Sequence, residues 1–402
     1  MNFNKHIYIY IAILLAFNSC VEPIEIKGIN FENYLVVEAN LTDQLKKHTV
    51  KLTRSFTLND TIPKYESNAT IRIIDNNQNT YTFSEKAEGI YESDDVFKAE
   101  AGNNYTLFIS TNDGNEYSST PEKISGINQI NDITIEKSAT PENIEGLKIN
   151  VISNTKDTNS LYYRYEYDET YKIVAPYWSE LELVPTSTSF PFSVDLVKKN
   201  YQSKICYKTV SSNKILLTKT TELDKNNVDF TIRFLEKDDF IIAHRYSILI
   251  KQYVQSANAY RFYKTLKKFS TSQEPFTQIQ PGLIPSNISN LNNKETSGNV
   301  IGFFEVSSYS EKRFFFNYLD LYKPQGLNYP SSCEFIAPLL TDGRYPAFYS
   351  PLIKELKKDK FIFFKTTTDP NRTTPGPYTL VPKVCGDCRV LGTNEKPSFW
   401  ID

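Results

Sequence analysis

Five cysteines are the residues of this chain whose type and spacing most directly predict chemistry. One of them, Cys20, stands near the N-terminus, directly after the small residue Ser19 and an apolar run. A cysteine at that point is what a lipoprotein signal peptidase requires, because the thiol is acylated and then becomes the new N-terminus. We therefore predict that Cys20 carries a lipid. The remaining cysteines form an even set in the second half of the chain: Cys206, Cys333, Cys385 and Cys388.

The segment before Cys20 has the layout of an export signal. Lys5 supplies a basic start, and an almost unbroken apolar run extends over residues 7–17. This run fits the apolar region of a secretory signal and is shorter than the roughly 20 residues that span a bilayer. An ordinary signal peptide with an incidental cysteine is the alternative. With lipidation, residues 20–33 form a tether, and two or more acyl chains anchor the protein without a transmembrane helix.

The other four cysteines predict two disulfides, because an even number in an exported chain is typical of structural bridges. Three pairings are possible, and the sequence does not separate them. Cys385 and Cys388 form a C-x-x-C motif that could instead close on itself, as redox motifs do. Such motifs start a helix after a strand, whereas Pro382 precedes this one and a Gly-Thr-Asn turn at 392–394 follows it. A four-cysteine zinc site usually needs a second C-x-x-C pair, so disulfides are the favoured interpretation.

The rest of the chain contains no recognisable catalytic set. His48 and His244 have no histidine or glutamate neighbour at a metal-binding spacing. There is no nucleophile elbow, phosphate loop or dinucleotide fingerprint, and the acidic pairs at 94–95 and 238–239 are more typical of solvated loops than of calcium sites. The net charge of −2, from 45 basic and 47 acidic residues, gives no electrostatic footprint for nucleic acid. We expect no catalytic residue, no metal, no cofactor and no nucleic-acid partner.

Residues 34–124 predict a small β-sandwich. Short alternating strands are expected at 34–39, 49–54, 69–74, around Tyr81 and Phe83, and at 105–109. Asp-Asn-Asn at 75–77 and Asn-Asp-Gly-Asn at 112–115 are turn signals, the second of the strong Asp-Gly type. Strands at this spacing are typical of immunoglobulin-like or transthyretin-like sandwiches. A linker is expected at 125–132.

Residues 133–402 predict a larger β-rich domain that ends in a disulfide-stapled tail. Strands are expected at 133–135, 147–152, 161–167, 214–219, 229–235, 246–253 and 300–307. In the strand at 161–167, Tyr163 and Tyr165 share one face, and Arg164 and Glu166 share the other.

One segment of this domain, residues 256–269, has the period of an amphipathic helix. Ser256 is a suitable N-cap, and the lysines fall in the last turn, where the helix dipole favours them. A helix that lies on the sheet is the favoured interpretation, and a basic helix on a membrane surface is the alternative.

Several motifs together resemble an uncharacterised, domain-of-unknown-function family of Bacteroidota outer-membrane lipoproteins encoded beside TonB-dependent receptors. They are the signal with its cysteine, Leu-Thr-Asp at 41–43, Gly-Ile-Tyr at 89–91, the helix at 256–269 and Gly-Asn-Val-Ile-Gly-Phe-Phe at 298–304. The most specific are the ending motifs, Cys-Gly-Asp-Cys-Arg at 385–389 and Pro-Ser-Phe-Trp at 397–400. The likeness covers nearly the whole mature chain.

The resemblance implies a role without implying catalytic residues. It implies a lipid-anchored accessory protein at the cell surface that works with an outer-membrane TonB-dependent receptor barrel in substrate capture or uptake. A structural or assembly lipoprotein of a larger outer-membrane complex is the alternative.

Asp-Thr-Ile at 60–62 also fits a short pattern that is glycosylated in exported Bacteroidota proteins, which makes Thr61 a candidate O-glycosylation site.

The lipid prediction can be tested by changing one atom of the attachment residue. The Cys20→Ser variant should leave the membrane fraction, because a serine hydroxyl does not replace the thiol that is acylated. Fractionation followed by mass analysis of the N-terminal peptide measures this. A Cys20→Ser protein that stays in the membrane fraction would show that lipid is not the anchor.

Overall fold

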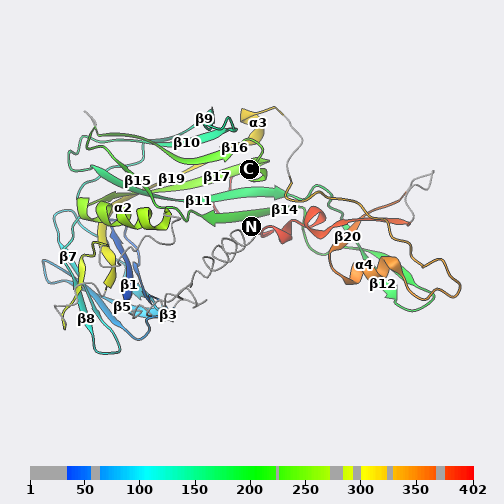
Figure 1. Ribbon diagram of the computed structural model, residues 1–402, viewed down its shortest axis with the longest axis horizontal. Helices are drawn as coiled ribbons and strands as arrows, with labels where there is room; N and C mark the ends of the chain where they lie inside the picture. The colour runs from blue at the N-terminus through cyan, green and yellow to red at the C-terminus, as the bar shows by residue number, and fades with distance from the viewer. Residues whose placement is uncertain are drawn as a thin grey trace, which may run out of the picture.

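The structure is a computed structural model that describes residues 34–55, 64–222, 226–271, 284–292, 300–323, 329–367 and 376–402. The predicted, mainly β fold is confirmed. Two β-rich bodies meet at an angle, and a narrow arm projects from the second body, away from the first (Figure 1). A 14-stranded mixed sheet runs through both bodies.

The first body consists of short antiparallel strands that curl around their own core. Their order in the sheet is β1-β2-β6-β5-β4-β7-β8-β18, with β3 beside β2. Inward side chains of β1, β4 and β7 belong to one buried cluster, which is why the sheet must fold back on itself. The bounds are β1 Leu35–Thr42, β2 Thr49–Arg54, β3 Lys64–Tyr65, β4 Thr70–Asp75, β5 Thr80–Ala87, β6 Ile90–Ser93, β7 Tyr105–Ser110, β8 Glu116–Ser119 and β18 Ile288–Asn290.

Both predicted hairpin turns of this body are present. The Asp75 carboxylate accepts hydrogen bonds from the backbone N–H groups of Asn77 and Asn79, at 2.8 and 2.9 Å, in the turn between β4 and β5. Gly114 adopts a φ of 83° in the turn between β7 and β8, a conformation that glycine reaches without steric cost. These turns set the strand register. The alternating apolar and polar residues of each strand therefore face the core and the solvent, respectively.

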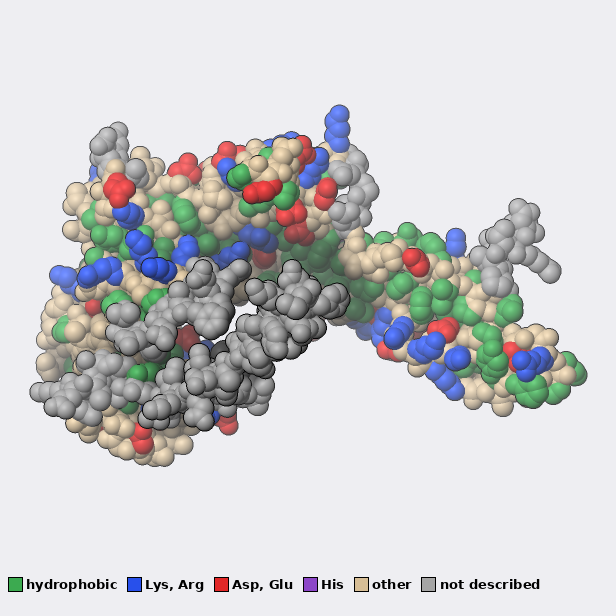
Figure 2. Space-filling view, viewed as in Figure 1, with side chains coloured by type: hydrophobic (Ala, Val, Ile, Leu, Met, Phe, Trp, Pro, Cys, Tyr) green, Lys and Arg blue, Asp and Glu red, His purple; other side chains and the backbone are tan. Residues whose placement is uncertain are grey.

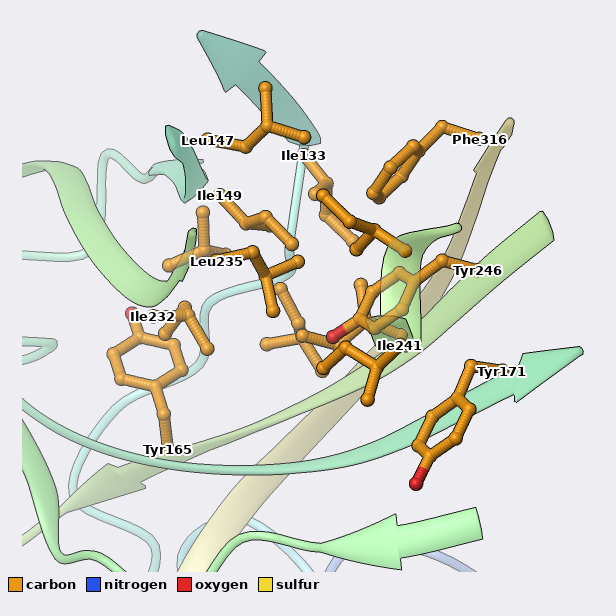
Figure 3. Packing of buried hydrophobic residues seen from close by; sticks show 14 of the residues in the cluster. Ile133, Leu147, Ile149, Tyr165, Tyr171, Ile232, Leu235, Ile241, Tyr246 and Phe316 are labelled. Atoms are coloured by element: carbon orange, nitrogen blue, oxygen red, sulfur yellow. The ribbon is translucent and has the colours of Figure 1, made fainter. Parts of the chain in front are cut away.

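The second body is a sandwich of two sheets. The larger sheet continues the first body's sheet through β19, β17, β11 and β14, with β15 also paired to β11. A three-stranded sheet of β9, β10 and β16 covers one of its faces, and isoleucine, leucine and tyrosine side chains fill the space between them (Figure 3). The bounds are β9 Asp132–Ala139, β10 Glu145–Asn154, β11 Tyr162–Val174, β14 Ile205–Ser211, β15 Leu216–Lys219, β16 Asn227–Glu236, β17 Arg245–Gln255 and β19 Val300–Asn317.

The face alternation predicted for 161–167 explains this sandwich. Tyr163 and Tyr165 are fully buried between the two sheets, whereas Arg164 and Glu166 point to the opposite face. Short helical segments, η1 (Phe240–Ile242) and α3 (Tyr318–Leu321), close one end of the core.

The strand β19 joins the two bodies. Its first part pairs with β1 in parallel, from Leu35 opposite Val300 to Thr42 opposite Ser307. Its second part pairs with β17 antiparallel, up to Arg245 opposite Asn317. Gly302 has a φ of 147°, and a Cβ there would lie 2.2 Å from the backbone oxygen of Val37. The parallel pairing therefore requires a glycine at this position.

The predicted helix is confirmed as α2 (Ala257–Thr271). Its first turn is capped as expected, because the Ser256 hydroxyl accepts from the backbone N–H of Ala259 at 3.1 Å. Ala259 and Phe262 are buried against Phe303 of β19, so the helix packs on the sheet. No helix in the described part of the chain is long and apolar enough to cross a bilayer.

The predicted linker at 125–132 and the domain boundaries around it stay predictions. The strand pairing adds that the chain returns to the first body after α2, because β18 pairs with β8 and the start of β19 pairs with β1.

A buried histidine lies in the first body. His48 is 2% exposed, its Nε2 is 3.0 Å from the backbone oxygen of Phe97, and its ring meets the Phe97 ring edge-on at 4.8 Å. Burial lowers the pKa of His48 to about 4, the Phe97 carbonyl opposes this shift, and the charge of Lys46 adds to it. His48 is therefore a neutral core residue at neutral pH.

This pKa predicts a loss of stability in acid. Between about pH 6.5 and pH 4 the unfolded chain binds a proton at His48 that the folded chain does not bind, so stability falls as the pH falls. The contribution of His48 at pH 4 should be a loss of about 3 kcal/mol. The His48→Gln variant keeps an N–H donor but does not titrate. Urea unfolding of both proteins at pH 7 and pH 4 should show the smaller acid loss in the variant, and equal losses would contradict this account.

Candidate functional site, a disulfide-braced arm

The arm is built from two segments that lie far apart in the sequence. A hairpin of β12 (Leu181–Ser187) and β13 (Ser193–Lys198) forms one side. The other side contains α4 (Pro351–Lys357) and a second hairpin of β20 (Phe361–Thr366) and β21 (Tyr378–Pro382). The two sides share a small core whose fully or nearly buried members are Leu183, Leu352, Phe363 and Leu380.

Two disulfides brace the base of the arm, and one of them ties it to the second body. Cys206 in β14 is bonded to Cys388, and Cys333 is bonded to Cys385, with Cα–Cα distances of 5.6 and 5.7 Å. The prediction of two disulfides is confirmed, and the alternative in which Cys385 and Cys388 close on each other is wrong. Cys385 lies in α5 (Lys383–Gly386) and Cys388 begins η4 (Cys388–Val390), with Asp387 in an extended conformation between them, and the two sulfur atoms reach different partners. Within the described residues no group of three or more acidic, histidine or cysteine side chains is placed to hold a metal.

The C-terminal tail continues from Cys388 onto the second body. Trp400 is buried against Tyr207 and Phe315, with ring centroids at 5.0 and 5.7 Å. The guanidinium of Arg313 lies 3.5 Å from the Phe399 ring centroid. The Cys-Gly-Asp-Cys-Arg and Pro-Ser-Phe-Trp motifs are thus structural, since the first braces the arm and the second packs the tail on the sheet.

The outer end of the arm exposes large apolar side chains. Tyr345 is 91% exposed and Phe348 is 73% exposed, and the ring of Phe190 on the β12–β13 turn packs against Tyr345 at 5.5 Å. Figure 2 shows apolar side chains gathered over this end of the arm. We call this set the aromatic tip; it consists of Phe190, Tyr345, Phe348 and Tyr349. Exposed aromatic clusters of this kind are enriched at protein interfaces, because rigid rings bury a large area with little loss of side-chain entropy.

A buried charge cluster lies at the opposite end of the second body, where the two bodies and α2 meet. Arg164, with a 7% exposed side chain, pairs with Glu305, 1% exposed, at 3.2 Å and also with Glu166. The rings of Tyr253 and Tyr263 lie 4.1 and 4.6 Å from its guanidinium carbon. Burial opposes the charge on Arg164, but these tyrosines and glutamates hold its pKa above the usual value.

This cluster reaches the first body through Tyr309. The Tyr309 ring packs edge-on against Tyr253 at 5.2 Å, and its backbone N–H donates to the Asp43 carboxylate at 2.8 Å. The ammonium of Lys46 lies 5.5 Å from the same ring. The cluster therefore contacts α2 through Tyr263 and the first body through Tyr309.

The sequence-predicted site residues have different outcomes. The four cysteines Cys206, Cys333, Cys385 and Cys388 lie together at the base of the arm. Cys20, the tether at 20–33 and Thr61 lie outside the described residues, so lipidation and glycosylation stay predictions. The arm itself was not predicted. A signal was available in Ser350-Pro351, an N-cap followed by an N1 proline, directly after the aromatic run at 345–349.

A family model matches most of the chain. The family model described as "Domain of unknown function (DUF4249)" matches residues 21–313. The matched region includes the strands of both bodies through Arg313 in β19 and the β12–β13 hairpin, and the remainder of the arm follows it in sequence. No curated protein matches the chain.

The disulfide pairing predicts a selective effect on the arm. Peptide mapping without reduction should recover Cys206 linked to Cys388 and Cys333 linked to Cys385. The Cys333→Ser/Cys385→Ser variant opens a loop of 52 residues, which should cost about 2–5 kcal/mol of local stability. Limited proteolysis should then cut the arm faster while the first body resists as before.

The Cys206→Ser/Cys388→Ser variant serves as the comparison, because it keeps the bridge within the arm and frees the arm base from β14. In this variant the protease should cleave the C-terminal tail faster than in the wild type, whereas cleavage near the aromatic tip should not change. A peptide in which Cys385 and Cys388 are bonded to each other would contradict the pairing.

Proposed function

The chain belongs to the DUF4249 family, a domain of unknown function, and from this premise we propose that it is a lipid-anchored outer-membrane accessory protein. In this proposal the lipid at Cys20 holds the protein at the membrane, and the arm docks on a TonB-dependent receptor barrel. The protein would then assist the capture or uptake of the barrel's substrate without catalysing a reaction.

The observation that carries the proposal is the projecting arm with its aromatic tip. Tyr345 is 91% exposed and Phe348 is 73% exposed at the end of the braced arm. Exposed apolar patches of this kind mark interaction sites, because they are rare on proteins that bind no partner. The brace supports the same interpretation, because the disulfides restrict the arm at its base and lower the entropy that is lost on docking.

The shape of the molecule suits a membrane-bound partner. The arm and the first body lie at opposite ends of the second body (Figure 1). The described chain begins in the first body at residue 34, 14 residues after Cys20. The lipid and the aromatic tip can therefore act at separate places, one on the bilayer and one on a protein embedded in it.

Co-purification tests the docking. The wild-type protein should be recovered with a barrel protein when outer membranes are solubilised in mild detergent. The Tyr345→Ser/Phe348→Ser variant should lose at least about tenfold of the recovered barrel, because buried interface aromatics often contribute 2 kcal/mol or more each. Quantitative mass spectrometry of the purified complex measures the ratio.

The matched control is Leu45→Ser/Val96→Ser, which removes two exposed apolar side chains from the first body. It should leave the barrel recovery unchanged. A wild-type protein that runs alone, or an equal loss in both variants, would contradict docking through the arm. Deletion of the gene separates the proposal from a purely structural role. If the protein assists uptake, the deletion should cause loss of growth on one nutrient. If its role is structural, the deletion should cause loss of envelope integrity.

A further inference from the structure

A hollow of about 460 Å³ opens on the arm between the β12–β13 hairpin and α4. Its lining combines aromatic and aliphatic side chains with two lysines: Thr188, Phe192, Phe348, Tyr349, Ser350, Ile353, Lys354 and Lys357. The lining includes no carboxylate, although acidic residues are as frequent as basic ones in the chain. The hollow is therefore apolar at its floor and cationic at its rim.

The two rim lysines are available to a ligand. The carboxylates near them are engaged elsewhere, because Glu355 pairs with Lys358 at 2.6 Å and Asp359 pairs with Lys383 at 2.5 Å. Within the described residues, neither Lys354 nor Lys357 forms an ion pair, and Lys354 lies 5.9 Å from the Tyr349 ring centroid. Both lysine side chains are exposed on one short helix whose Leu352 and Ile353 are buried.

A second hollow of about 580 Å³ lies beside the first and shares Tyr349 and Lys354 with it. Its remaining lining is mostly apolar, with Ile336, Ala337, Pro338, Pro351, Phe361 and the paired Glu355. Two adjoining hollows separated by one aromatic residue and one lysine form a row on the arm surface. Successive side chains of an extended segment can enter such a row, as in recognition modes in which pockets take alternate side chains.

We infer that this row binds an extended segment of the protein partner in which a carboxylate side chain lies next to an aromatic or aliphatic one. The apolar side chain enters the hollow against Phe192, Phe348 and Tyr349, and the carboxylate meets the ammonium groups of Lys354 and Lys357. This inference rests on the proposed function, in which the arm is the docking surface, and it specifies what the partner presents there.

A protein segment fits the geometry better than an anionic lipid. An acyl chain is held by enclosure along its length, whereas the walls of these hollows include Phe348, which is 73% exposed. Aromatic side chains surrounded by a polar, solvent-accessible rim are the usual anatomy of a protein interface. The lysines supply the matching charge for acidic side chains, which favours the correct partner and speeds its approach.

Binding of a defined peptide tests this inference. The probe is a capped, fluorescein-labelled peptide of alternating aspartate and phenylalanine, measured by anisotropy against the full lipidated protein in phospholipid nanodiscs. Comparison peptides replace every aspartate by lysine or every phenylalanine by serine. Saturable binding of the first peptide is expected, with at least about a tenfold weaker affinity for either comparison peptide and weaker binding at high salt.

The Lys354→Glu/Lys357→Glu variant should weaken binding of the probe by at least about tenfold, because charge reversal replaces attraction by repulsion. Its matched control is Lys156→Glu/Lys208→Glu, which makes the same change of charge at exposed lysines of the second body. The control should bind the probe like the wild type. Equal losses in the two variants, or no saturable binding, would overturn the inference.

Three further outcomes separate a lipid site from the inferred segment, and the inference from the proposed function. If dodecanoate displaces the probe and binds the wild type more tightly than the peptide does, the hollow is a lipid site and the inference is wrong. If the probe does not bind while the aromatic-tip variant still loses the barrel, docking stands and the inferred segment chemistry fails. If the probe binds as expected but no barrel is recovered, the segment chemistry stands and the proposed partner fails.

Discussion

The parallel pairing of β1 with β19 is the constraint on which the rest of this molecule depends. A parallel pair joins strands that are distant in sequence, here 265 residues apart between Leu35 and Val300. Its backbone hydrogen bonds make one continuous sheet out of what would otherwise be two small β structures. Gly302 permits the close approach, and β19 then continues into the second body as the support for α2, the C-terminal tail and the charge cluster.

The buried charge cluster where the two bodies and α2 meet costs desolvation energy. Removing Arg164 and Glu305 from water costs several kcal/mol for each ion, and good geometry with further hydrogen bonds must offset that cost. Gln255 donates to Glu305 at 3.1 Å, and Tyr253 donates to Glu166 at 3.1 Å. Removing one partner would leave a buried charge uncompensated, so the cluster penalises rearrangement around Arg164 and Glu305 more than it adds to total stability.

The sequence predicts the local structure of this chain much better than its long-range organisation. The bounds of β2 agree with the expected strand, and α2 agrees with the expected helix within two residues, because turn residues, caps and periodicity act over a few positions. The presence of disulfides could also be predicted from the sequence, although their pairing could not. An even set of cysteines predicts two disulfides, but the choice of partners depends on where β14 and the tail meet in space.

The arm is not predicted from the sequence, because it depends on contacts between distant segments. Its core joins Leu183 to Leu352, Phe363 and Leu380, and no single segment of that set has enough periodicity to define an element. Strands such as β13 expose most of their residues, so the expected alternation is weak there. The aromatic tip depends on the fold in a similar way, since Phe190 and Tyr345 become neighbours only when the hairpin and the loop before α4 are brought together.

The order of the cysteines along the chain has a consequence for biogenesis. For a chain that crosses the inner membrane from its N-terminus, Cys206 and Cys333 emerge before either native partner, Cys388 or Cys385. Among the four cysteines that form disulfides, the first two to meet an oxidising enzyme would thus be two that are not native partners. Correct pairing then needs either delayed oxidation or thiol–disulfide exchange after the last residues arrive. The arm would be the last part of the protein to mature, and cells that lack a disulfide-exchanging chaperone would accumulate the protein with folded bodies and an unfinished arm.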